Sequence, residues 1–183
     1  RIQGADVCGE IIGVGAGVDP GRIGERVITD GWLRDAGDLD NINKTGYFGS
    51  ERDGGFAEYT TTPARNALAV ISDLSDAELA TFSCSYSTAE GMLTRAQVTE
   101  ADTVLVPGAS GGVGGALVQL AKRRGARVIA MASEAKHKEV AALGPDKILP
   151  RAPQNLRAAL GDETITVVAD VVGGPYWPTL IDS

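Results

Sequence analysis

Histidine, cysteine and aromatic residues are scarce in this sequence. Its 183 residues include one histidine and two cysteines, and 5% are aromatic. The spacing of Cys8 and Cys84 matches no metal-binding set, and two cysteines do not form the disulfide framework of a secreted domain. We therefore expect both to be small buried residues. The single histidine, His137, lies in a charged stretch and is expected to be solvated.

The sequence also lacks an excess of basic residues and a long apolar run. Seventeen basic against twenty-four acidic residues give a net charge of −7. This argues against a nucleic-acid surface, which needs a basic stripe to bind phosphates. No stretch approaches the roughly 20 apolar residues of a membrane span, and no signal peptide opens the sequence. We therefore expect a cytoplasmic protein without nucleic-acid or membrane partners.

The first half of the sequence is predicted to be a β region. Glycines and turn signals such as Asp19-Pro20-Gly21 separate β-rich runs at residues 7–14, 25–29 and 56–62. We expect these runs to form antiparallel strands, as a small barrel, with residues 30–52 as a long surface loop. The sequence starts without methionine and stops within an apparent helix start. We therefore expect it to be part of a longer chain.

The second half shows the alternation of strand and helix that is typical of a parallel α/β sheet. Short apolar strands are predicted at residues 103–107, 127–132, 147–149 and 165–172. Helical periodicity separates them at residues 113–124, 134–143 and 155–160, each stretch ending near a glycine. This order predicts parallel strands joined by right-handed crossovers.

A glycine-rich turn follows the strand expected at residues 103–107. Gly108 begins the bend, Gly111 and Gly112 leave room for a ligand at the backbone, and Gly114 lets the next helix lie close to the sheet. A turn between strand and helix is the context that this motif requires for binding a dinucleotide. The helix start would then face the pyrophosphate, which we expect to be held by the residues Ser110, Gly111, Gly112 and Val113.

The end of the second strand favours NADP over NAD. An NAD site would place an acid there to bind the ribose hydroxyls. The strand instead ends in Ala132-Ser133, and Lys136 follows three residues later. The Ser133 hydroxyl and the Lys136 ammonium are suited to a 2′-phosphate, although Glu134 lies beside them and Ser133 can also serve as a helix cap.

The whole sequence resembles the medium-chain dehydrogenase/reductase superfamily. The order and separation of seven short segments carry the resemblance. The segments are the glycine-rich turn and residues 4–10, 24–27, 54–59, 87–89, 142–144 and 170–174. The resemblance implies a fold of class α/β, in which a Rossmann-type parallel sheet is preceded by part of a GroES-like β-barrel domain. The partial GroES-like domain would cover residues 1–85, and the partial Rossmann domain residues 86–183.

The sequence departs from the zinc-dependent members of this superfamily. They carry Gly-His-Glu where this chain has Gly4-Ala5-Asp6, and alanine cannot bind metal. Residues 30–55 also lack the cysteines of their structural zinc lobe. The sequence thus resembles the zinc-independent quinone oxidoreductase or enoyl reductase branch, which needs no metal site.

This branch implies hydride transfer from NADPH to a quinone or an α,β-unsaturated carbonyl compound. The resemblance places Thr88, at the expected start of the linking helix, beside the nicotinamide half of the cofactor. It also implies a homo-oligomer for the intact protein. No catalytic residue is assigned, and Tyr47, Phe48 and Tyr86 are each candidates either for the substrate pocket or for packing.

Two alternatives stay open. The chain could be a nucleotide-binding relative without catalysis, or a truncated and inactive fragment. It could also belong to a zinc-dependent alcohol dehydrogenase whose metal ligands lie outside these residues, although Ala5 argues against this.

Overall fold

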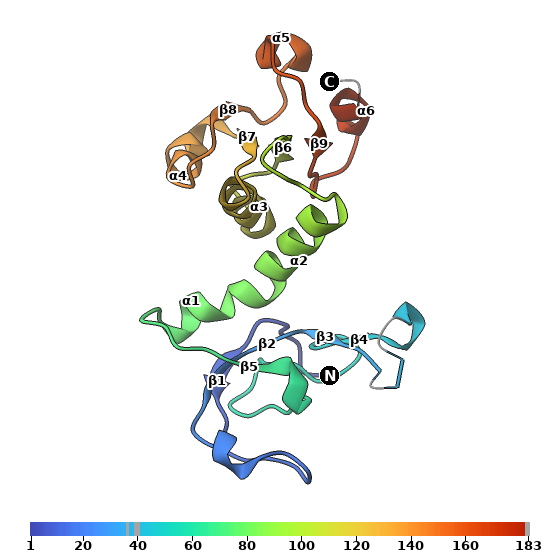
Figure 1. The fold of residues 1–183 in the computed structure, drawn as a ribbon, viewed down its shortest axis with the longest axis vertical. Coiled ribbons are helices and arrows are strands. Elements are labelled where there is room, and N and C mark those ends of the chain that lie inside the picture. Colours follow the sequence, from blue (N-terminus) through green and yellow to red (C-terminus); the bar gives the residue numbers. More distant parts are fainter. Residues whose placement is uncertain (36, 39–40, 182–183) are drawn as a thin grey trace. The chain divides into compact units, whose positions relative to one another are not determined.

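The chain folds into two compact units, Arg1–Cys84 and Ser85–Ser183 (Figure 1). The computed structural model describes residues 1–35, 37–38 and 41–181. Helix α2 (Phe82–Arg95) runs across the division between the units.

Unit 1 consists mainly of short antiparallel strands. A three-stranded sheet has the order β1-β2-β5, and β3 pairs with β4 as a separate ribbon. The strands are β1 (Cys8–Glu10), β2 (Arg26–Thr29), β3 (Trp32–Leu33), β4 (Gly46–Tyr47) and β5 (Ala67–Ala69). The helical turns are η1 (Pro20–Arg22), η2 (Ile42–Lys44), η3 (Ala64–Asn66) and α1 (Asp76–Ala80).

Two arginines connect the sheet of unit 1 to the segments around it. The guanidinium of Arg22 donates to Glu25 and to the carbonyl oxygens of Ala64 and Ala67, at 2.7–2.9 Å. The guanidinium of Arg26 binds Asp76 and donates to the carbonyl oxygens of Ser72 and Leu74. Except for that of Ala67, the first residue of β5, these carbonyl groups lie outside the strands, so the bonds hold irregular chain against the sheet.

The predicted strand at residues 56–62 does not form. Gly54 lies against Gly4 so closely that a β-carbon at Gly54 would overlap the carbonyl oxygen of Gly4. The amide of Phe56 donates to Gln3, but no ladder follows, and the Phe56 side chain is 78% exposed. The segment is therefore held by a close approach of two backbones and not by strand pairing.

Three further expectations for unit 1 are wrong. Residues 30–52 are not a plain surface loop, because β3 and β4 lie there and Phe48 is buried; positions 36, 39 and 40 of this segment lie outside the described residues. Strand β1 is shorter than the predicted 7–14. The cysteines are not both buried, since Cys8 is partly exposed and Cys84 is exposed.

Unit 2 is a four-stranded parallel sheet with helices on both faces. The strand order is β8-β7-β6-β9. The strands are β6 (Thr103–Pro107), β7 (Arg127–Ala132), β8 (Lys147–Pro150) and β9 (Val167–Val168). The helices after α2 are α3 (Gly112–Arg123), η4 (Glu134–Lys136), α4 (His137–Ala141), α5 (Leu156–Leu160) and α6 (Trp177–Ile181). The parallel α/β sheet predicted from the sequence is thus confirmed, with β6 and β7 at their predicted bounds.

Two hydrophobic clusters cover the two faces of this sheet. One cluster joins α2, α3 and α4 to the sheet through residues such as Leu93, Leu117 and Val140. The other joins α5 and α6 to the opposite face through Leu160 and Leu180. Strands β6 and β7 are buried on both faces, as expected of apolar strands in a parallel sheet.

Two elements of unit 2 differ from their prediction. The last strand is limited to Val167–Val168, because the Asp170 carboxylate accepts from the amides of Val172 and Gly173 and turns the chain away from the sheet. The helix predicted at 134–143 is divided into η4 and α4. The first turn is narrow because the Lys136 amide donates to the carbonyl oxygen of Ser133, three residues earlier.

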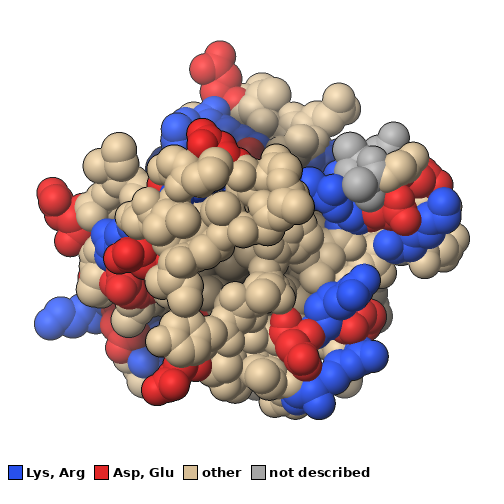
Figure 2. Space-filling model, turned by 90° about the horizontal axis from the view of Figure 1, so that it is seen from below, with Lys and Arg blue, Asp and Glu red and all other residues tan. Residues whose placement is uncertain are grey.

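Within the described part of the chain, no helix has the length and apolar character needed to cross a membrane. Acidic and basic side chains are interspersed at the margin of the face drawn in Figure 2, and its centre is uncharged and hollowed. Among the described residues, this face shows no continuous basic patch.

Asp102 links the start of β6 to the approach to β9. Its carboxylate accepts from the Thr99 amide at 2.8 Å, the Thr166 hydroxyl at 2.8 Å and the Thr99 hydroxyl at 3.1 Å. The Thr166 hydroxyl oxygen in turn accepts from the Thr103 amide at 3.0 Å. These bonds, first among them the one from the Thr99 amide, lower the pKa of the Asp102 carboxyl.

We predict that Asp102→Asn removes part of the acid sensitivity of unit 2. A carboxyl whose pKa is lower in the folded state stabilises the fold above its unfolded value of about 4, and this stabilisation is lost as the pH falls through the folded value. The variant should therefore lower the urea midpoint at pH 7 and reduce its drop between pH 7 and pH 3.5. Pulsed hydrogen exchange on β6 and β7 peptides measures unit 2 alone. Asp162→Asn is the control, because the structure describes no hydrogen bond or ion pair for Asp162. Equal pH dependence in the two variants would contradict the prediction.

Candidate nucleotide-binding site

The glycine-rich turn lies where the strand order of unit 2 reverses direction. From β6 the chain passes through α3 to β7 and then β8 on one side, whereas β9 pairs with β6 on the other side (Figure 1). The loop after β9 reaches this turn, since a β-carbon at Gly108 would lie 2.7 Å from Cγ2 of Val172. Open parallel sheets bind ligands at the carboxyl ends of the strands at such a switch point.

Two glycines of the turn are required by its geometry. Gly108 has a φ of +66°, a conformation that other residues rarely adopt. A β-carbon at Gly114 would overlap the carbonyl oxygen of Gly108 and lie 2.7 Å from its carbonyl carbon. The first turn of α3 therefore lies directly on the end of β6, as the sequence pattern predicts.

Gly111 has a different role, because neither its backbone conformation nor the space around it requires a glycine. It is the N-cap of α3 with an extended φ of −87°, and its nearest contact for a β-carbon is the Gly108 oxygen at 3.4 Å. No side chain caps the helix. The amides of Gly112, Val113 and Gly114 consequently have no acceptor among the described residues. Because a helix start carries partial positive charge, these three amides form a place for an anionic oxygen.

The predicted second anion contact lies after β7. Ser133 is the N-cap of η4, exposed, and its hydroxyl makes no capping bond. Lys136 is also exposed, but its ammonium contacts both carboxylate oxygens of Glu139 at 2.9 Å. The sequence singled out Glu134 as the neighbouring acid, whereas Glu139 is the one that pairs with the lysine. Ser133 and Lys136 are thus both accessible to a ligand, and the Lys136 ammonium is paired with the Glu139 carboxylate.

His137 is not fully solvated, contrary to the expectation. Its ring is partly buried and Nε2 lies 3.2 Å from the carbonyl oxygen of Ala132, the last residue of β7. The ring therefore covers the end of β7, next to Ser133.

Thr88 lies in the middle of α2, not at a helix start. Its amide lies within the helix, so only its exposed side chain could contact a ligand. Ser85 of α2 approaches the glycine turn, since its Oγ would lie 2.7 Å from a β-carbon at Gly112. Sequence reasoning missed Ser85 and Val172. A helix predicted from residue 82 onward would have placed Ser85 on the same face as Thr88.

Each of the three aromatic candidates for the substrate pocket is buried or makes a contact within its own unit. Phe48 is 2% exposed, Tyr47 stacks on Trp32 with ring centroids 6.0 Å apart, and the Tyr86 hydroxyl accepts from Gln119 at 2.9 Å.

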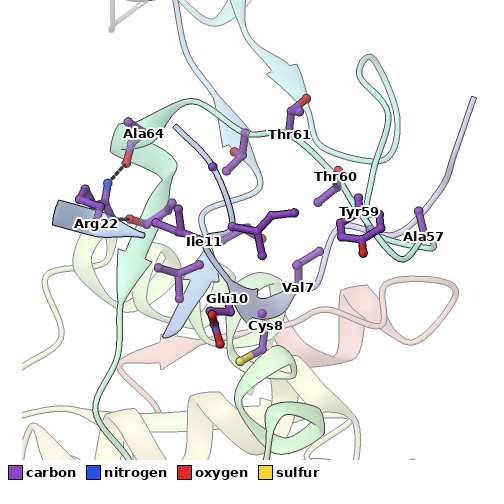
Figure 3. A pocket seen from close by; sticks show the side chains of 18 of the residues that line it. Val7, Cys8, Glu10, Ile11, Arg22, Ala57, Tyr59, Thr60, Thr61 and Ala64 are labelled. Atoms are coloured by element: carbon purple, nitrogen blue, oxygen red, sulfur yellow. Dashed lines mark hydrogen bonds between the residues drawn. The ribbon is translucent and has the colours of Figure 1, made fainter. Parts of the chain in front are cut away.

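Unit 1 has a hollow of about 900 Å³ that none of these aromatic residues lines. Val7 and Ile11 approach it from the β1 segment, and Tyr59 and Thr60 from another segment (Figure 3). It is mostly apolar. The hydroxyls of two lining residues, Thr29 and Thr62, are buried and have no partner in the described part of the chain. The hollow is large enough for a small organic molecule.

The side chains near Ala5 do not fit a zinc site. The Asp6 carboxylate accepts from the Cys84 amide at 2.8 Å, and Cys8 lies 3.5 Å from Asp76. Burial, followed by the hydrogen bond and charge of Asp76, raises the pKa of the Cys8 thiol, so the thiolate that zinc requires is disfavoured. Over residues 1–35, 37–38 and 41–181, no three acidic, cysteine or histidine side chains converge on a possible metal position.

A parallel sheet with a tight glycine turn and an uncapped helix at its switch point defines the Rossmann class of α/β fold. Residues 1–73 match the alcohol dehydrogenase GroES-like domain. Together with the relatives below, this shows that the chain belongs to the medium-chain dehydrogenase/reductase superfamily.

Three relatives illustrate how similar this chain is to known proteins. The acryloyl-coenzyme A reductase of Metallosphaera sedula is 32% identical and matches 100% of this chain and 56% of its own length. A candidate alcohol dehydrogenase from Sinorhizobium meliloti has a solved structure with 47% identity, 100% and 51% coverage, and a TM-score of 0.90. A short chain alcohol dehydrogenase from Escherichia coli CFT073, solved with NADH, has 26% identity, 94% and 54% coverage, and a TM-score of 0.84. The chain thus spans about half the length of these relatives.

We predict that Gly114→Ala destabilises unit 2 by about 2 kcal/mol or more, because the new methyl group must displace the end of β6 from α3. Gly91→Ala is the matched control in α2, where a β-carbon meets nothing within 4 Å. It should stabilise the chain by about 0.5–1 kcal/mol through helix propensity. Urea unfolding measures both effects, and a Gly114→Ala variant as stable as the parent would contradict the described contact.

Proposed function

We propose that the protein containing this chain is an NADPH-dependent oxidoreductase that transfers hydride to a quinone or an α,β-unsaturated carbonyl compound without zinc. The observation that carries the proposal is the set of three amides at the start of α3, at the switch point of the sheet, that have no acceptor among the described residues.

The glycine turn fits the diphosphate of a dinucleotide. The buried Gly114 fixes the start of α3, and the exposed Gly111 and Gly112 leave the amides accessible. Ser110 is exposed beside them and can add a hydroxyl donor. We assign the diphosphate to Ser110, Gly111, Gly112 and Val113, and the nicotinamide side to Thr88.

The end of β7 supports NADPH over NADH. It ends in Ala132 and offers no carboxylate for two ribose hydroxyls, while the Ser133 hydroxyl makes no capping bond and Lys136 is exposed. Both groups suit a 2′-phosphate. The relative solved with NADH is the argument for the other cofactor.

In the part of the chain that the structure describes, the side chains around Ala5 do not fit a zinc site, which supports a reaction without zinc. Conjugated substrates do not require a metal, because charge that develops on hydride addition spreads to the carbonyl oxygen, where hydrogen bonds can stabilise it. The relative from Metallosphaera sedula bears the name of a reductase for an acryloyl thioester, which is an α,β-unsaturated carbonyl compound. NADPH would supply the hydride. The residues of this chain would bind and orient it.

We predict that Gly111→Ser weakens binding of NADPH at least tenfold while the fold keeps its stability. Serine is a favoured N-cap, and its hydroxyl would accept from the amides that the diphosphate otherwise takes. The φ of −87° at this position suits serine. Titration calorimetry measures the affinity, and urea unfolding checks stability. Unchanged affinity in a folded Gly111→Ser variant would refute the assignment of the glycine turn.

The reaction is tested by following NADPH oxidation with a panel of quinones and enones, together with metal analysis of the protein. Turnover without bound zinc supports the proposal. Tight NADPH binding without turnover would favour a non-catalytic or truncated form. One equivalent of zinc that is required for activity would favour an alcohol dehydrogenase and overturn the proposal.

A further inference from the structure

The ion pair between Lys136 and Glu139 lies at the position where the proposed function places a 2′-phosphate. The Lys136 ammonium contacts both oxygens of Glu139 at 2.9 Å, and the two side chains are 49% and 65% exposed. Neither residue supports the core, because α4 packs against the sheet through Val140. The pair is therefore free to reorganise when an anion arrives.

We propose that Glu139 is a specificity-determining residue that lowers the preference of the site for 2′-phosphorylated dinucleotides. This inference rests on the proposed function, since it needs a nucleotide whose ribose lies at the end of β7. Glu139 competes with the phosphate for Lys136 and also repels it. A ligand with a 2′-hydroxyl experiences neither effect to a comparable degree, because it carries no charge at that point.

The same ion pair leaves the site able to accept both kinds of nucleotide. An exposed pair at this spacing is weak, so a phosphate with a charge near −2 can displace the carboxylate from the lysine. The expected state is thus a moderate preference for the phosphorylated ligand that increases when Glu139 loses its charge.

The test measures the affinities of adenosine 2′,5′-bisphosphate and of AMP for the full chain by calorimetry at low salt. Glu139→Gln should tighten the bisphosphate about fivefold, the scale of one surface charge pair, and leave AMP unchanged. Lys136→Gln should weaken the bisphosphate, and Glu139→Gln should gain less than twofold in the Lys136→Gln background. Raising the salt to about 0.5 M should reduce the effect, because the charges are exposed.

Glu134→Gln is the matched control. Glu134 is an exposed acid in the same segment, and the structure describes no ion pair for it. An equal gain in Glu134→Gln and Glu139→Gln would show a general charge effect and overturn the specific role of Glu139. All variants are checked by circular dichroism.

The outcomes separate the two proposals. If Lys136→Gln lowers the preference for the bisphosphate but Glu139→Gln leaves it unchanged, the inference about Glu139 fails and the proposed cofactor preference stands. If the parent chain is folded and binds neither ligand, or binds both equally with no effect of Lys136→Gln, the proposed function fails at this site and the inference falls with it.

Discussion

The close approach of α3 to the end of β6 is the constraint on which the rest of unit 2 depends. It exists because Gly114 has no side chain to keep the helix away from the Gly108 carbonyl. With the helix start fixed there, Leu117 and Val118 enter the core beside β6 and β7. The same contact leaves the first amides of α3 at the switch point of the sheet. The packing of α3 on the sheet and the geometry of the candidate site therefore both depend on this contact, and a change at Gly114 affects both.

The two units are stabilised by different means. Both hydrophobic clusters lie in unit 2, where the apolar strands β6 and β7 are enclosed between helices. In unit 1 few hydrophobic side chains are buried, and apolar residues such as Phe56 and Ile71 are exposed. Its irregular segments are held by arginine side chains that bind carbonyl oxygens and by close backbone contacts between glycines. Such bonds contribute less than apolar burial and depend on a few positions.

This difference explains how much the sequence could predict. Strands β6 and β7 form at their predicted bounds. Both are buried on both faces, and such strands consist of a continuous apolar run that can be recognised in the sequence. In unit 1, by contrast, residues 56–62 have strand composition but no partner strand. The glycines of the candidate site follow from local geometry and could be read from their spacing. Val172 could not, because it acquires its significance from a contact between segments far apart in the sequence. Ser85 and Glu139 lie three residues from Thr88 and Lys136, but this spacing does not specify which of several neighbouring side chains makes the contact.

The candidate site combines two kinds of recognition that respond differently to conditions. At the glycine turn, neutral amides and a helix dipole would face the ligand in the proposed site, and the specificity would come from the absence of side chains at Gly111 and Gly112. After β7, an exposed lysine and a competing carboxylate act through charge, which salt screens over about 8–10 Å. The net charge of −7 would not prevent either contact, since a phosphate bound at these groups would lie far closer to them than a Debye length. Under the proposed function, affinity for the diphosphate and discrimination at the ribose would therefore be separable, because backbone geometry would determine the first and an adjustable pair of surface charges the second.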